Sequence, residues 1–234
     1  MQKDKIQEKD DKKMICITGD THGEYNELLN RMYNNQIKKG DTAIVCGDFG
    51  FVWNDPYHRY FIAKLTAENF TIAFVDGNHE DFDLLETYPV TYWNGGKVHK
   101  IAENIYHLMR GQRFVIEGKS FFTMGGAYSV DKEMRTEHIS WWSQELPSSI
   151  DYKTAETTLK KYGYSVDYVL THTLPQSAIH YLGLVPCPQD AELTGYFEWL
   201  KRNLKFKMWF SGHFHMNRLV DDKIRVLFND VVKL

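Results

Sequence analysis

Five short polar clusters interrupt the apolar runs of this chain, and they limit the possible folds more than any other feature. Each cluster directly follows a run of β-branched and apolar residues, which is the pattern of a buried strand. The clusters are Asp20-Thr21-His22, Gly47-Asp48, Gly77-Asn78-His79-Glu80, Thr171-His172 and Gly212-His213-Phe214-His215. We therefore expect a fold that gathers polar loops at the ends of several strands.

Strands and helices alternate in the first third of the sequence. The pattern predicts strands over 14–18, 42–46 and 71–75, with helices over about 26–36 and 57–69. Strands that alternate with helices form largely parallel sheets, and the carboxyl ends of parallel strands share an edge. Ligands of open α/β sheets bind at that edge, so we expect the first three clusters to converge.

The middle of the chain consists of short strand-like runs with tight turns, which favours an antiparallel section. These runs lie at 97–101, 105–108, 113–116 and 120–124.

The last third returns to alternation and ends in a hairpin. We expect helices over about 149–162 and 192–203, and each precedes a strand that leads into a histidine cluster. The runs 218–221 and 223–228 look like a closing hairpin. No linker or internal repeat is visible, so the sequence predicts one domain over 14–234, preceded by a charged, solvated tail over 1–13.

Composition places the chain among ordinary globular proteins. It has 234 residues, of which 43% are hydrophobic and 25% charged. The formal net charge of −3 argues against a general electrostatic attraction to nucleic acid, which we therefore consider only as a substrate. No segment resembles a signal peptide or a membrane span, so no membrane partner is expected. The oligomeric state stays open.

The three cysteines, Cys16, Cys46 and Cys187, form no close pair in the sequence. Such a sparse and odd set is typical of buried free thiols rather than of a disulfide framework. Reduced cysteines suit a cytoplasmic location.

The clusters together contain the side chains of a metal centre: two aspartates, one asparagine and up to five histidines. Carboxylate, amide oxygen and imidazole suit hard or borderline divalent ions. In an extended segment, alternate residues point the same way, so Asp20 can share an ion with His22, and His213 with His215. The set is large enough for two ions that share one carboxylate.

The clusters and their order resemble the calcineurin-like metallophosphoesterase superfamily, from about Met14 to Phe228. The resemblance implies an α/β fold in which two mixed β-sheets pack as a sandwich flanked by helices. The implied metal ligands are Asp20, His22 and His215 for the first ion, Asn78, His172 and His213 for the second, and Asp48 as the bridge between both.

The resemblance also implies a mechanism, in which a metal-bound hydroxide attacks phosphorus in line. His79 resembles the catalytic residue that contacts the phosphate or protonates the leaving group. Glu80 is a candidate to accept a hydrogen bond from an imidazole and fix its orientation. Manganese is the ion we favour, with iron, zinc, nickel, cobalt or magnesium as alternatives.

Two loops are candidates for substrate selection. Phe49 to Trp53 lacks the arginine that protein Ser/Thr phosphatases of the superfamily carry after the bridging aspartate, so the chain resembles the smaller bacterial and phage members instead. The loop from Gly125 is either a tight turn or a cover over the metals. In the second case Ser129, Asp131 and Arg135 bind substrate together with Asn78, since a guanidinium fits phosphate well.

The sequence thus predicts a hydrolase that cleaves a phosphate ester with two divalent ions. The alternatives are a phosphodiesterase of nucleotides or nucleic acid, a Ser/Thr-type protein phosphatase, and a scaffold that keeps the fold without catalysis. Because every expected ligand position is filled, the enzyme is favoured over the scaffold.

Overall fold

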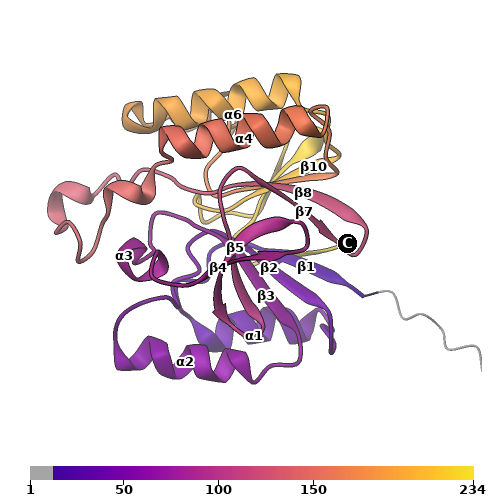
Figure 1. Ribbon diagram of the computed structural model, residues 1–234. Coiled ribbons are helices and arrows are strands. Elements are labelled where there is room, and N and C mark those ends of the chain that lie inside the picture. Colours follow the sequence, from indigo (N-terminus) through magenta and orange to yellow (C-terminus); the bar gives the residue numbers. More distant parts are fainter. Residues whose placement is uncertain (1–12) are drawn as a thin grey trace, which may run out of the picture.

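In the computed structural model, which describes residues 13–234, two mixed β-sheets pack against each other and helices cover their outer faces (Figure 1). This agrees with the predicted fold class. The predicted tail lies outside the described residues except for Lys13. The extent of the domain stays a prediction.

The first sheet has seven strands in the order β13-β1-β2-β3-β6-β5-β4. Strands β1, β2, β3 and β6 run parallel to one another, and the remaining strands pair antiparallel. The strands are β1 (Ile15–Thr18), β2 (Thr42–Cys46), β3 (Thr71–Val75), β4 (Val90–Trp93), β5 (Gly96–Ala102), β6 (Ile105–Leu108) and β13 (Val231–Lys233).

The second sheet has six strands in the order β11-β12-β10-β9-β8-β7, with β8, β9, β10 and β12 parallel. The strands are β7 (Gln112–Ile116), β8 (Lys119–Met124), β9 (Tyr168–Thr171), β10 (Met208–Ser211), β11 (Arg218–Val220) and β12 (Ile224–Val226).

Helices cover both outer faces (Figure 1). Helices α1 and α2 lie under the first sheet, and α4 and α6 lie over the second. The helices are α1 (Tyr25–Asn34), α2 (Pro56–Thr66), α3 (Phe82–Leu85), α4 (Ser149–Lys161), α5 (Gln176–Tyr181) and α6 (Ala191–Asn203).

The central strands β1, β2 and β3 are largely apolar because both of their faces are buried. Alternate side chains of β1 point opposite ways: Ile15 and Ile17 pack between the sheets, while Cys16 faces the helices. In β10, Phe210 faces the space between the sheets and Trp209 packs under α6. Cys16 and Cys46 are buried free thiols, as expected, and Cys187 is also free.

The main departure from the prediction concerns the middle of the chain. Its four expected strands exist, but they do not form one antiparallel section: β5 and β6 extend the first sheet, while β7 and β8 belong to the second. The pairing of β6 with β3 is parallel and long-range, and local turn signals do not encode it. Strands β4 and β13 and helix α5 were not predicted, since each is only a few residues long.

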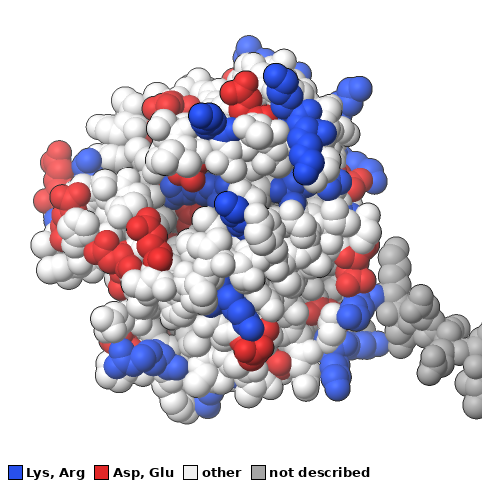
Figure 2. Space-filling model, viewed as in Figure 1, with Lys and Arg blue, Asp and Glu red and all other residues white. Residues whose placement is uncertain are grey.

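The segment between β8 and α4 projects from one side of the molecule (Figure 1). It contains two short 3₁₀ helices, Lys132–Met134 and Ser143–Glu145. On the face shown in Figure 2, acidic side chains gather over this projection, and several basic ones gather over one end of α4 and α6. The remaining charges on that face are mixed, which agrees with the weak net charge.

Candidate metal centre

All five polar clusters lie where the sequence places them, directly after strands β1, β2, β3, β9 and β10. Within each sheet these strands are parallel, so their loops meet at one edge. Contacts among the loops connect all seven expected metal ligands, which are Asp20, His22, Asp48, Asn78, His172, His213 and His215.

The first group of donor atoms belongs to Asp20, His22 and His215, whose ligand atoms all lie within 4.8 Å of one another. His215 Nε2 is 3.1 Å from Asp20 Oδ2 and 2.9 Å from His22 Nε2. Two imidazole nitrogens and a carboxylate oxygen therefore face one small volume, which is the arrangement that a divalent cation requires.

The second group centres on His172, which is fully buried. Its Nδ1 contacts the carbonyl of Cys46 at 2.9 Å, and as the donor in this bond it leaves the Nε2 lone pair free. That Nε2 is 3.1 Å from Asn78 Oδ1 and 3.3 Å from Asp48 Oδ1. The His213 ring lies against the His172 ring, with centroids 4.9 Å apart.

The backbone of the site is held in unusual conformations. His22, Asp48, His213 and His215 have φ angles of 46°, 48°, 70° and 47°. Residues other than glycine rarely adopt this left-handed backbone conformation, and each one that does destabilises the folded state by roughly 1–3 kcal/mol. Four of the seven expected ligands share this cost, which is typical of a functional site.

Two glycines allow the loops to approach one another. A Cβ on Gly77 would lie 2.0 Å from Asp48 Oδ1, and one on Gly47 would lie 2.1 Å from His172 Nδ1. Any side chain at either position would displace a ligand, so glycine is required there.

Backbone hydrogen bonds join the first two loops. The carbonyl of Asp48 accepts from the amides of Thr21 and His22, at 3.0 and 2.9 Å. Asp48 Oδ1 accepts from the His79 amide at 2.9 Å, and Asp20 Oδ1 accepts from the His213 amide at 2.9 Å. Both carboxylates are thus fixed by backbone donors.

The electrostatics of the site favour bound cations. Burial alone would raise the pKa of Asp48, but His172, His79 and His22 hold it well below its usual range. Burial alone would lower the pKa of His172, yet Asp48 and Asp20 raise it, and a hydrogen bond with Asp20 raises the pKa of His215. The carboxylates thus draw protons onto neighbouring imidazoles, and divalent ions would replace these protons.

His79 lies at the rim of the site, with its ring centroid 5.6 Å from that of His22. Arg135 Nη1 donates to His79 Nδ1 at 3.0 Å, and its Nη2 donates to Asp131 Oδ2 at 2.8 Å. Burial and the Arg135 charge lower the pKa of His79, although Asp48 opposes them. Arg135 Nη2 also lies 3.4 Å from His79 Nε2, so donors of one guanidinium face both nitrogens of the ring.

The loop after β8 reaches the site. Ser129 is buried and its Oγ accepts from Asn78 Nδ2 at 3.0 Å. Of the candidate substrate-binding residues, Ser129 thus contacts Asn78 and Arg135 contacts His79, while Asp131 is paired with Arg135.

The partner expected for Glu80 was wrong. Its carboxylate accepts from the backbone amides of Phe49 and Gly50, at 2.8 and 3.4 Å, rather than from an imidazole. Glu80 is fully buried and fixes the loop that follows Asp48. Chain adjacency to His79 gave no information on where the side chain points.

The aromatic residues near these loops mainly pack in the core. Phe49, Phe51 and Trp142 are buried in one hydrophobic cluster, and Trp53 packs against it. These four side chains therefore serve mainly to pack the core beside the site.

Sequence reasoning missed several residues that support the site. Arg31 is buried under the first loop and donates to the carbonyl of Asp20 at 2.9 Å. The signal was present, since Arg31 lies among the inward positions Leu28 and Met32 of a predicted helix. Asp76 also follows a strand directly, and its position was a comparable signal. Glu145 gave none.

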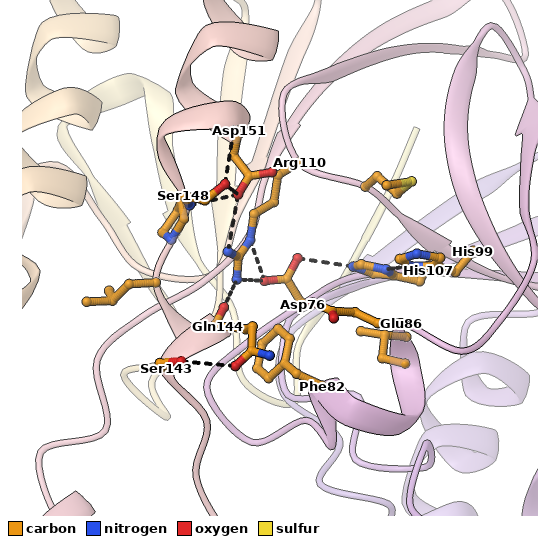
Figure 3. A pocket seen from close by; sticks show the side chains of 14 residues that line it. Asp76, Phe82, Glu86, His99, His107, Arg110, Ser143, Gln144, Ser148 and Asp151 are labelled. Atoms are coloured by element: carbon orange, nitrogen blue, oxygen red, sulfur yellow. Dashed lines mark hydrogen bonds and ion pairs between the residues drawn. The ribbon is translucent and has the colours of Figure 1, made fainter. Parts of the chain in front are cut away.

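A cavity of about 600 Å³ lies beside Asp76, and Figure 3 shows its lining. Asp76 accepts from Arg110 Nε at 2.9 Å and from His107 Nε2 at 3.0 Å, and His107 in turn contacts His99. Burial alone would raise the pKa of Asp76, but Arg110 and His107 hold it far below its usual range. The charges of this network are internally paired, so it fixes the loop between β3 and Asn78.

The fold and this site together define a metallophosphoesterase. The family model described as calcineurin-like phosphoesterase matches residues 13–217, and the chain belongs to this family of metal-dependent hydrolases that act on phosphoric ester bonds.

Two similar proteins illustrate the relationship. A lariat debranching enzyme from Gallus gallus is 25% identical over 244 residues, a match that covers 86% of this chain and 42% of the relative. The chain thus spans less than half the length of that relative. A solved protein serine/threonine phosphatase from Saccharomyces cerevisiae, with similarity to human phosphatase PP5, is 17% identical with a TM-score of 0.40. That match covers 93% of this chain and 67% of the other.

Among residues 13–234, no helix has the length and apolar character that crossing a membrane requires.

Proposed function

We propose that this chain hydrolyses phosphoric esters with two divalent ions bound at the edge where the strand ends meet. The proposed ligands are Asp20, His22 and His215 for one ion, Asn78, His172 and His213 for the other, and Asp48 for both. The observation that carries the proposal is the convergence of two adjoining groups of donor atoms that share Asp20. One is Asp20 with His22 and His215, and the other is Asp20 with Asp48 and His172, next to Asn78.

Asp48 is suited to bridge the two groups because its oxygens face different ones. Oδ1 is 3.3 Å from His172 Nε2, and Oδ2 is 4.0 Å from His22 Nδ1. A carboxylate in this position holds two dications close together while it offsets their repulsion.

Two bound ions would supply a water of lowered pKa as the nucleophile and would offset the charge of the phosphate. The chain's own residues bind and orient the ester. We assign His79 as the residue that contacts a phosphate oxygen or protonates the departing oxygen. Arg135 orients this ring through Nδ1 and brings a positive charge next to it.

Manganese is the ion we propose, because mixed oxygen and nitrogen donors without thiolate suit it. Iron, zinc, nickel, cobalt and magnesium are the alternatives for the same donor set.

The substrate class includes both phosphomonoesters and phosphodiesters. The relative named as a lariat debranching enzyme gives a reason to test diesters, including those of nucleotides and nucleic acids. A protein phosphatase is less well supported, because Phe49, a buried aromatic residue, follows Asp48 where those enzymes carry arginine.

The test is turnover of para-nitrophenyl phosphate and bis(para-nitrophenyl) phosphate by protein loaded with manganese. Wild type should hydrolyse at least one ester, and Asp48→Asn should lose the activity by at least about a thousandfold, because the shared carboxylate charge is removed. Asp222→Asn, an exposed carboxylate outside the site, is the matched control and should retain full activity. A fully loaded wild type that turns over neither ester, nor any nucleotide, would favour the scaffold instead.

A further inference from the structure

We propose that Ser129 and Glu145 are positioning residues that orient the carboxamide of Asn78 toward the second metal ion, and that Arg110 anchors them. This inference rests on the proposed two-ion function. It concerns how one ligand obtains the orientation that it needs.

An asparagine binds a cation only through its oxygen. Its amide group can rotate by half a turn with little change in shape, and it would then present two N–H donors to the ion. The environment of Asn78 therefore has to select one of two orientations. The contacts on its two sides show how the selection is made.

On the far side of the amide, Asn78 Nδ2 donates to Ser129 Oγ at 3.0 Å. On the near side, Asn78 Oδ1 lies 3.1 Å from His172 Nε2, in the second group of donor atoms. The hydroxyl of Ser129 must act as the acceptor for this orientation to be preferred.

Glu145 makes Ser129 an acceptor. Glu145 is only 2% exposed, and its Oε2 accepts from the backbone amide of Ser129 at 3.1 Å. The Ser129 side chain lies close enough to this carboxylate to offset part of the rise in its pKa that burial causes. Because a carboxylate only accepts hydrogen bonds, the Ser129 hydroxyl is oriented to donate to it, which leaves an oxygen lone pair for Asn78. Nδ2 is therefore directed to Ser129, and Oδ1 to the metal side.

Arg110 fixes the segment that carries Glu145. Its Nη2 donates to the carbonyls of Gln144 and Glu145, at 2.8 and 3.3 Å, and its Nε donates to Asp76 at 2.9 Å. Asp76 precedes Asn78 by two residues, so one guanidinium joins the Asp76 carboxylate to the segment that carries Glu145, through Gln144 (Figure 3). The series of contacts from Asp76 through Arg110, Glu145 and Ser129 to Asn78 thus begins and ends on the loop that follows β3.

The experiment is a calorimetric titration of metal-free protein with Mn²⁺, which requires no turnover. Wild type should bind two ions. Ser129→Ala should bind one of them about 10- to 100-fold more weakly, as is usual when a group that orients a ligand is lost, and should bind the other ion unchanged. Glu145→Gln, with one acceptor oxygen instead of two, should weaken the same ion.

Ser129→Thr, which keeps the hydroxyl, should restore the affinity. Ser143→Ala removes an exposed hydroxyl two residues from Glu145 and is the matched control with no expected change. If Ser129→Ala binds both ions as tightly as wild type, or weakens both equally, the positioning role is overturned. Wild type that binds fewer than two ions would instead overturn the two-ion function, and this inference with it.

Discussion

The two sheets contribute different kinds of side chain to the site. The first sheet supplies the oxygen ligands Asp20, Asp48 and Asn78, all of them buried. The second sheet supplies only imidazoles, and these range from the fully buried His172 to His215, whose side chain is 52% exposed. The first sheet also supplies His22, whose side chain is 34% exposed. The carboxylate charge therefore comes from the first half of the molecule alone, whereas imidazole donors come from both.

The support for the two halves differs in the same way. The carboxylates of the first half are held by backbone amides, and the loop that carries Asp20 is also held by the buried Arg31. Within residues 13–234, the His215 side chain forms polar contacts only with Asp20 and His22, and it stacks on the Phe228 ring. This difference indicates that the first half is a rigid frame that folding must complete, whereas His215 can be removed with little structural cost.

The largest effect on stability should come from a substitution in the rigid first half, at Arg31. Arg31 Nη1 donates to the carbonyls of Asp20 and Phe228, at 2.9 and 2.7 Å, and Arg31→Met would remove both bonds and leave the buried carbonyl of Asp20 without this donor. We expect the free energy of unfolding to fall by about 3 kcal/mol, measured by denaturant titration of metal-free protein.

Arg202→Met is the matched control. Arg202 forms an exposed i,i+4 pair with Glu198, and its loss should cost less than about 1 kcal/mol. Equal losses in the two variants would show that the first half has no special frame.

The sequence predicts the site better than it predicts this frame. The ligands are visible because polar residues at the ends of apolar strands stand out locally, and parallel strands bring their ends together. The support depends on side-chain direction and long-range pairing. Arg110 reaches Asp76 across 34 positions, and Glu80 bonds the backbone of a loop 31 positions earlier.

The same limit applies to the sheets. Strands 71–75 and 105–108 were recognised individually, but their parallel pairing was not. Local spacing identifies a strand through its period and turns. Its partner is decided by the packing of the whole molecule.

A smaller effect on stability depends on whether a buried carboxylate has a cationic partner. Arg110 and His107 lower the pKa of Asp76, whereas burial raises the pKa of Asp190 to about 6, although the amide of Tyr128 opposes this. A raised pKa stabilises the fold below the unfolded value near 4, and this stability is lost as pH rises through about 6.

Asp190→Asn should therefore raise the free energy of unfolding by about 2 kcal/mol at pH 8 and change it little at pH 4. Thermal unfolding across this pH range is the measurement, with the exposed Asp222→Asn as the control. If the stability of Asp190→Asn relative to wild type does not increase from pH 4 to pH 8, ionisation of Asp190 does not destabilise the folded protein.

The smallest effect on stability is expected at His215. Its Nε2 contacts Asp20 at 3.1 Å, but Asp20 keeps the amide of His213 as a donor when the imidazole is removed. The hydrogen bond with Asp20 raises the pKa of His215, so this pair stabilises the fold below about pH 6.5 and loses that contribution at higher pH. At pH 8, His215→Ala should therefore change the unfolding free energy of the metal-free protein by less than about 0.5 kcal/mol.

The same variant should bind one Mn²⁺ ion at least about tenfold more weakly, since a proposed ligand is lost. If His215→Ala instead destabilised the metal-free protein as much as Arg31→Met, the exposed imidazole would belong to the frame and the contrast between the two halves would fail.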